Sequence, residues 1–271
     1  MTNPASVLED RQPAAPYAKA PIGWLIFVLQ FVTVALAYVL ASILPTLPAL
    51  IATVSAAISD PAAATPAPEL GSGLVASTVI ASAIGAIFVA WLWLRREGRV
   101  MEALRLKRPA SWRFTIGLAA LATGGTILIF VLGAQLTQAL GLGSPDPSFV
   151  LDLVTESPAL FALWVVGIAW FAAGFGEEVL YRGFLMDRLE RLPGLRGRTN
   201  TILFVQAILF GLPHAYQGAG GMVVTAMVGL LLGWVRNRSG GNLWAAIIAH
   251  AMVDTIMMSL AFGESLGCYA T

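Results

Sequence analysis

Residues 158–186 read PALFALWVVGIAWFAAGFGEEVLYRGFLM. At about 1.5 Å per residue, a helix of this length crosses the roughly 30 Å hydrocarbon core of a bilayer. The run nevertheless contains Glu177, Glu178 and Arg182. A charged side chain is costly inside a membrane, so it is retained mainly where it has a partner or a function. This one stretch therefore predicts a membrane-spanning helix that also carries chemistry.

The whole chain has the same apolar character. Of its 271 residues 58% are hydrophobic and 11% are charged, and the mean hydropathy is +0.79. These values exclude a soluble globular protein. The net charge of +1 provides no basic surface for nucleic acid. A single cysteine, Cys268, excludes a disulfide framework.

The apolar stretches are helical in length and lack the period-two alternation of membrane β-strands. The predicted fold is an all-α polytopic transmembrane helical bundle of about seven spans. The spans are 22–44, 72–94, 114–140, 158–186, 200–217, 218–235 and 242–262. The Pro45 and Pro48 region can extend the first span to about residue 58, and residues 214–221 can form a turn at membrane depth.

The basic residues predict the orientation of the bundle. Of the 16 lysines and arginines, all except Arg182 fall in the amino-terminal arm or in alternate loops on one side. Such residues stay on the cytoplasmic side of a membrane. We therefore expect a cytoplasmic amino terminus, an external carboxyl terminus and a multi-pass integral membrane protein, in the inner membrane if the source is bacterial.

The predicted organisation has four parts. Residues 1–21, rich in proline, form a disordered cytoplasmic arm, and residues 22–157 form a three-span region without ionisable side chains inside the spans. Residues 158–262 form the catalytic core, and residues 263–271 a short tail. The chemistry is therefore expected in the second half of the chain.

Six ionisable residues lie inside the predicted spans: Glu177, Glu178, Arg182, His214, His250 and Asp254. Glu178 and Arg182 are four apart, in the favourable order for an ion pair on one helix face. His250 and Asp254 are also four apart, so the carboxylate can orient the imidazole. Helical rise places Glu177 ~15 Å, His250 ~12 Å and His214 ~21 Å from the cytoplasmic ends of their helices. We expect these side chains to meet in one layer.

Such a cluster suits hydrolysis. A carboxylate beside imidazoles can act as a general base toward water, and a second imidazole can stabilise the oxyanion of a tetrahedral intermediate. The same residue types can hold a divalent metal such as zinc, with Glu177, His214 and His250 as the ligands. The metal-free and metal-dependent interpretations fit the sequence equally well. Nothing in the sequence indicates an organic cofactor.

Three motifs resemble those of a known family. Residues 177–182 match EExxxR, Phe210 to His214 match FxxxH, and His250 to Asp254 match HxxxN in its HxxxD variant. Their order on consecutive late spans resembles the CPBP family of intramembrane endopeptidases, also called the Abi family, which includes CAAX prenyl proteases and bacteriocin-processing enzymes. The resemblance covers about residues 158–262.

The resemblance implies a role for each motif residue. Glu177 and His214 would activate the attacking water, and His250 and Asp254 would stabilise the oxyanion or orient the substrate carbonyl. Glu178 and Arg182 would form a structural pair, and Phe210 would line the substrate site. Asp254 departs from the more usual asparagine, and a carboxylate cannot donate to an oxyanion unless it is protonated. The donor is therefore expected to be His250, oriented by Asp254.

We thus predict an intramembrane endopeptidase that uses Glu/His-activated water on a protein or peptide substrate in the bilayer, with no nucleic acid partner. Two alternatives from other classes remain. A proton-coupled carrier would use the same residues as a proton relay. A non-catalytic scaffold or immunity-type membrane protein would keep the fold of a protease without its activity.

Overall fold

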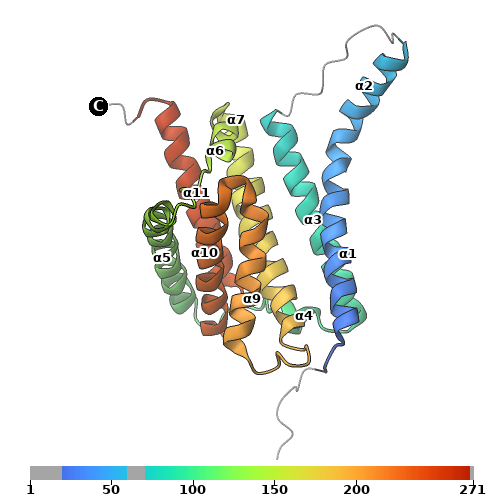
Figure 1. Ribbon diagram of the computed structural model, residues 1–271, viewed down its shortest axis with the longest axis vertical. Helices are drawn as coiled ribbons and strands as arrows, with labels where there is room; N and C mark the ends of the chain where they lie inside the picture. The colour runs from blue at the N-terminus through green and yellow to red at the C-terminus, as the bar shows by residue number, and fades with distance from the viewer. Residues whose placement is uncertain (1–19, 60–70, 269–271) are drawn as a thin grey trace, which may run out of the picture.

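The computed structural model describes residues 20–59 and 71–268. Within those ranges the chain is helical and contains no strand, which confirms the predicted fold class (Figure 1). Most of the predicted amino-terminal arm and the end of the predicted tail lie outside the described residues. The helices run roughly parallel to one long axis, so their ends form two opposite faces of the bundle (Figure 1).

The first half of the chain contributes three long helical segments. The first consists of α1 (Trp24–Ile43), the short 3₁₀ helix η1 (Leu44–Thr46) and α2 (Leu47–Ser59). It is thus longer than the predicted span 22–44, because the prolines occupy the first turns of new helical pieces, where a missing N–H costs nothing. The others are α3 (Ser72–Arg96) and α5 (Trp112–Ala139). Two short helices, α4 (Val100–Leu104) and α6 (Ser148–Thr155), lie in the connections.

The second half begins with one long helical segment. Ser157 caps α7 (Pro158–Leu163) by accepting a hydrogen bond from the N–H of Leu160, with Pro158 in the first turn. The segment continues as η2 (Trp164–Leu185), which has the π-type winding in which residue i bonds to residue i−5, and ends with α8 (Met186–Leu189). The predicted helix over 158–186 is therefore correct in extent but differs in winding. π-type turns often occur at functional sites.

A helical hairpin follows. It consists of α9 (Thr199–Gly211), the 3₁₀ helix η3 (Leu212–Gln217) and α10 (Gly218–Arg238), and α11 (Trp244–Ser265) closes the bundle. Among the residues that the structure describes, six segments are long and apolar enough to span a membrane, with Thr199–Arg238 as one of them. Within that segment α9 and α10 lie side by side (Figure 1). The chain therefore turns back near η3, as predicted, and about seven helical passes result.

Small residues bring α9 and α10 together. A Cβ atom on Gly229 would lie 3.0 Å from Cα of Ala207, and one on Gly233 would lie 2.7 Å from Nε2 of Gln206. Two helix backbones can approach this closely only where one of them lacks a side chain. Gly229 and Gly233, four residues apart on one face of α10, thus form the packing face against α9.

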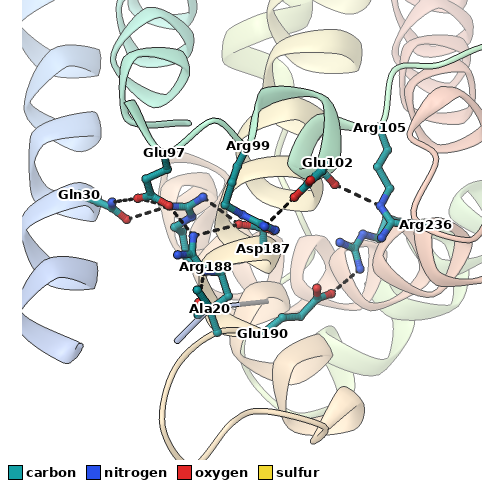
Figure 2. Close-up of polar contacts among 11 residues, drawn as sticks. Ala20, Gln30, Glu97, Arg99, Glu102, Arg105, Asp187, Arg188, Glu190 and Arg236 are labelled. Atoms are coloured by element: carbon teal, nitrogen blue, oxygen red, sulfur yellow. Dashed lines mark hydrogen bonds and ion pairs between the residues drawn. The ribbon is translucent and has the colours of Figure 1, made fainter. Parts of the chain in front are cut away.

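An ionic cluster joins the two halves at the arginine-rich end of the bundle (Figure 2). We call it the arginine-end cluster. Its members are Gln30, Glu97, Arg99, Asp187, Arg188 and Arg191. Asp187 and Arg188, both fully buried, form an ion pair of 2.8 Å. Asp187 also accepts from Arg99 at 2.9 Å, and Glu97 pairs with Arg188 at 2.8 Å. These contacts attach α1 and α3 to α8.

The charge of Glu97 is stabilised by this cluster. Burial acts to raise the pKa of its carboxyl group, but the hydrogen bond from Arg191, the charge of Arg188 and the hydrogen bond from Gln30 outweigh burial. The pKa of Glu97 therefore lies below its usual value. This contribution to stability is present above the unfolded-state pKa and is lost as pH falls through the folded-state pKa.

Candidate active site

Three elements bring the predicted site residues to one cavity. η2 carries Glu177, η3 carries His214, and α11 carries His250 and Asp254. These four side chains and Phe210 line a cavity of about 630 Å³ inside the bundle. Residues separated by more than seventy positions in the sequence thus share one space, as the depth comparison predicts.

Glu178 and Arg182 form the predicted pair beneath the cavity wall. Nη1 of Arg182 donates to Oε1 of Glu178 at 2.9 Å, and both side chains are fully buried. Nη2 of Arg182 donates to the Gly229 carbonyl at 3.3 Å. The guanidinium lies 4.0 Å from the ring centre of Phe210, a cation–π distance. The pair therefore links η2, α9 and α10.

Glu178 makes a second side-chain contact that was not predicted from the sequence. Its Oε1 lies 2.9 Å from Nδ1 of His250. An ionised carboxylate only accepts hydrogen bonds, so the His250 proton sits on Nδ1 and Nε2 faces the cavity. Glu178 thus belongs both to the structural pair and to the orientation of His250. Glu178 and His250 lie on different helices, so their spacing in the sequence does not predict this contact.

Two further carboxylates face the other nitrogen of His250. Oε2 of Glu177 lies 4.0 Å and Oδ2 of Asp254 lies 3.8 Å from Nε2. Both distances exceed that of a direct hydrogen bond. The expected orienting hydrogen bond from His250 to Asp254 is therefore not made in this structure, and Nδ1 of His250 donates to Glu178 instead. His250 lies among three carboxylates, with 11% of its side chain exposed.

Glu177 is the most accessible acid of the group. Its side chain is 33% exposed, whereas that of Glu178 is fully buried. Oε2 of Glu177 is buried, and no described residue donates a hydrogen bond to it. A buried oxygen without a partner is uncommon and requires an explanation such as a catalytic role. Glu177 therefore has acceptor capacity directed at the cavity.

His214 is positioned by a local break in the helix. Pro213 lies in the first turn of the 3₁₀ helix η3, and His214 itself has the non-helical angles φ −84° and ψ 16°. Its Nδ1 lies 3.0 Å from the Phe210 carbonyl oxygen, which can only accept. Neutral His214 thus carries its proton on Nδ1 and presents Nε2 as an acceptor.

A close helix contact fixes the position of α11 against η2. A Cβ atom on Gly174 would lie 2.7 Å from Cβ of Ala251, the residue after His250. Only glycine allows this approach, and the approach brings His250 to Glu178. Gly174 lies three residues before the acidic pair. Its importance could not be predicted from the sequence, because the sequence does not show that α11 is the helix packed against it.

The remainder of the cavity is mainly apolar and includes parts of the first half of the chain. Its walls include Val79 from α3, Phe130 from α5 and Met257 from α11. Tyr38 of α1 and Tyr216 of η3 also line it. Spans 1 to 3 contain no aspartate, glutamate, lysine, arginine or histidine, so no site residue was predicted in the first half of the chain. The sequence feature that could have pointed to Tyr38 as a cavity residue is its polar hydroxyl group within an apolar span.

The donor set does not fit a preformed metal site. Within the described part of the chain, no group of three or more His, Cys, Asp or Glu side chains is arranged to hold a metal ion. We therefore derive no step through a metal.

The comparisons with known proteins agree with the motifs. Residues 159–256 match the family model described as Rce1-like: Type II CAAX prenyl endopeptidase Rce1-like. The matched segment runs from α7 into α11 and contains all three motifs. The resemblance predicted from the sequence is thereby confirmed. Neither the curated proteins nor the solved structures gave a match.

Proposed function

We propose that this CAAX-protease-type membrane protein is an intramembrane endopeptidase in which Glu177 and His214 activate a water molecule. The observation that carries the proposal is the Glu177 carboxylate oxygen, which is buried in the cavity wall without a donor. His214 and His250 line the same cavity. A base, a second acceptor and an oriented imidazole in one space are the components of acyl hydrolysis.

The proposed reaction begins with attack of water on a peptide carbonyl. Glu177 accepts one proton of the water, with His214 Nε2 as the second acceptor that orients it. The water oxygen forms a bond to the carbonyl carbon, and the carbonyl oxygen becomes an oxyanion. Glu177 then returns its proton to the amide nitrogen as the C–N bond breaks. The products are a carboxylic acid and an amine.

His250 is the proposed donor to the oxyanion. Its Nδ1 proton is held by Glu178, so donation from Nε2 requires His250 to carry both ring protons. Three carboxylates around the ring supply the negative charge that stabilises this imidazolium. In this proposal Glu178 is a positioning residue, and Asp254 acts by charge at 3.8 Å rather than through a hydrogen bond.

The cavity also limits the substrate. Its walls are mainly apolar and lie within helices that can span a membrane. An apolar, concave site favours a substrate segment that is itself apolar. We therefore propose that the cleaved bond lies in a membrane-associated or carboxyl-terminal segment of a protein.

The test is peptide cleavage by the detergent-purified full chain. Wild type is compared with Glu177→Gln and with Glu264→Gln, a matched loss of one exposed carboxylate outside the cavity. The substrates are prenylated and unprenylated carboxyl-terminal peptides, each with and without a chelator. We expect kcat of Glu177→Gln to fall by about a hundredfold to ten-thousandfold, the usual contribution of a general base. Glu264→Gln should cleave as wild type does.

The arms of this experiment separate the alternatives. Full activity in folded Glu177→Gln would refute the mechanism. Chelator-sensitive cleavage would favour the metal-dependent interpretation with Glu177, His214 and His250. Failure of folded wild type to cleave any peptide would favour the scaffold or carrier interpretation.

A further inference from the structure

A second cavity lies at the arginine-rich end of the bundle. Its volume is about 620 Å³, within the usual size range of a small-molecule site. It is formed by the loop before α9, the end of α10 and the residue after α4. No residue lines both this cavity and the catalytic one. We call it the arginine pocket.

The lining of the arginine pocket is positively charged. Its ionisable members are Arg105, Arg196, Arg236 and Glu190. Glu190 pairs with Arg236 at 2.6 Å, and the two other guanidinium groups leave an excess of positive charge. Figure 2 shows the side chain of Arg105, the residue after α4, and that of Arg236 on α10 extending toward the same region, with Glu190 on the opposite side of Arg236.

Arg236 provides the evidence for a built site. The residue is only 6% exposed, and its Nε is buried with no hydrogen-bonding partner among the described residues. Nδ2 of Asn237, the next residue, is likewise a buried donor without a described partner. Unpaired buried donors are costly. Two of them on residues that line one cavity indicate that an acceptor from outside the chain completes the site.

The amino-terminal end of α9 also contributes positive electrostatic potential to the arginine pocket. Thr199 and Ile202, both in its first turn, line the pocket. No side chain caps this end, and its first turn contains no acidic residue. The free N–H groups and the positive end of the helix dipole therefore favour an anion there.

We propose that the arginine pocket binds a phosphate group, carried either by a phospholipid headgroup or by a soluble phosphate. Guanidinium groups donate two parallel hydrogen bonds to phosphate oxygens, a geometry that suits a tetrahedral oxyanion. The pocket is lined by residues at the ends of helices that can span a membrane, among them Thr199 and Arg236. The ends of such helices lie near lipid headgroups. Basic pockets between transmembrane helices in this position bind anionic lipid headgroups. The inference is independent of the proposed protease function.

The test measures binding to the delipidated, detergent-purified full chain by native mass spectrometry. Three probes are added separately: dioleoylphosphatidylglycerol, dioleoylglycerol without a phosphate, and inorganic phosphate. The variants are Arg196→Gln, which removes an exposed guanidinium from the lining of the pocket, and Arg236→Gln. Arg198→Gln is the matched control, because Arg198 is exposed in the same loop but does not line the pocket.

We expect wild type and Arg198→Gln to bind the phosphatidylglycerol equally, and Arg196→Gln to bind it about tenfold more weakly, the loss of one charged hydrogen bond. Dioleoylglycerol should not bind. If inorganic phosphate also binds and its binding also depends on Arg196, the site is one for soluble phosphates. If inorganic phosphate does not bind, the site is one for phospholipid headgroups. Equal binding by all variants, or equal binding of dioleoylglycerol, would overturn the proposal. Arg196→Gln decides the outcome if Arg236→Gln does not fold.

Discussion

At the level of single residues, the Glu178 and Arg182 pair determines how the site is held. Both side chains are fully buried, and Glu178 also holds Nδ1 of His250. Two charges in such a place are costly, and each is stable only because the other is present. The pair therefore couples the stability of the bundle to the orientation of a proposed catalytic group.

Breaking the pair on one side should destabilise the protein strongly. Arg182→Met leaves the Glu178 carboxylate buried without its cation, so we expect a loss of about 3–5 kcal/mol. Thermal unfolding in detergent measures this loss. The double variant Arg182→Met with Glu178→Gln removes both charges and should recover part of the stability. Additive losses in the double variant would show that the two side chains do not interact.

Asp254 offers a second test at this scale. An asparagine in its place keeps the shape and adds two donors that can reach an oxyanion. We expect Asp254→Asn to keep cleavage within about tenfold of wild type. Asp254→Leu should lose about a hundredfold or more, because leucine neither stabilises the charge of His250, the proposed oxyanion donor, nor supplies a donor of its own, and one such donor is worth that much. The measurement is kcat on one peptide at fixed pH. Equal activity of all three proteins would remove Asp254 from the site.

At the level of helices, close packing decides the geometry of the site. Gly174 lets α11 approach η2 so closely that a Cβ atom would lie 2.7 Å from Ala251. His250 and Asp254 flank that contact in the sequence. A change at this glycine therefore affects the position of the imidazole as well as the packing.

We expect Gly174→Ala to lower the stability by about 1–3 kcal/mol, the usual cost of overpacking. Cleavage should fall with it, because His250 moves away from Glu178. Gly117→Ala is the control, since a Cβ atom there meets nothing within 4 Å. Melting temperature and kcat are measured for both variants. An unchanged Gly174→Ala protein would show that α11 can shift without cost to the site.

At the level of the whole molecule, the two ends of the bundle differ in charge. The arginine-end cluster contains residues from α8, and the arginine pocket contains residues from the start of α9 and the end of α10, at one end of the bundle. The last residues of α11 lie at the other end (Figure 1). The arginine-end cluster joins α1 and α3 to the matched segment, so the first half of the chain is attached to the proposed catalytic half at that end.

The orientation predicted from the basic loops can be tested with the natural thiol. Cys268 is the single cysteine of the chain, and it is exposed. If the carboxyl terminus is external, a membrane-impermeant maleimide should label Cys268 in intact cells. In the control, Cys268→Ser combined with Arg198→Cys, labelling should require permeabilised cells. The reverse pattern would invert the predicted topology.

Much of this molecule could be predicted from the order of its residues. Apolar runs of spanning length predict the helices, because a backbone in lipid must satisfy its hydrogen bonds within the segment. The rarity of charge inside these runs isolates six residues, and the structure places four of them on one cavity and the remaining two as a buried pair beside it. The pair Glu178 and Arg182 is local in sequence, so its spacing predicts it.

Contacts between distant helices could not be predicted in this way. The partner of His250 is Glu178 rather than Asp254, because the approach of α11 to η2, permitted by Gly174, sets which carboxylate reaches Nδ1. The same holds for Tyr38, which joins the cavity only through the packing of α1, and for the arginine pocket, where three separate segments meet. The sequence by itself determined the helices, the membrane and the residues with chemistry, since these follow from local solvation and spacing. Only the tertiary structure decided which of those residues face one another, since that depends on how closely helices far apart in the chain can pack.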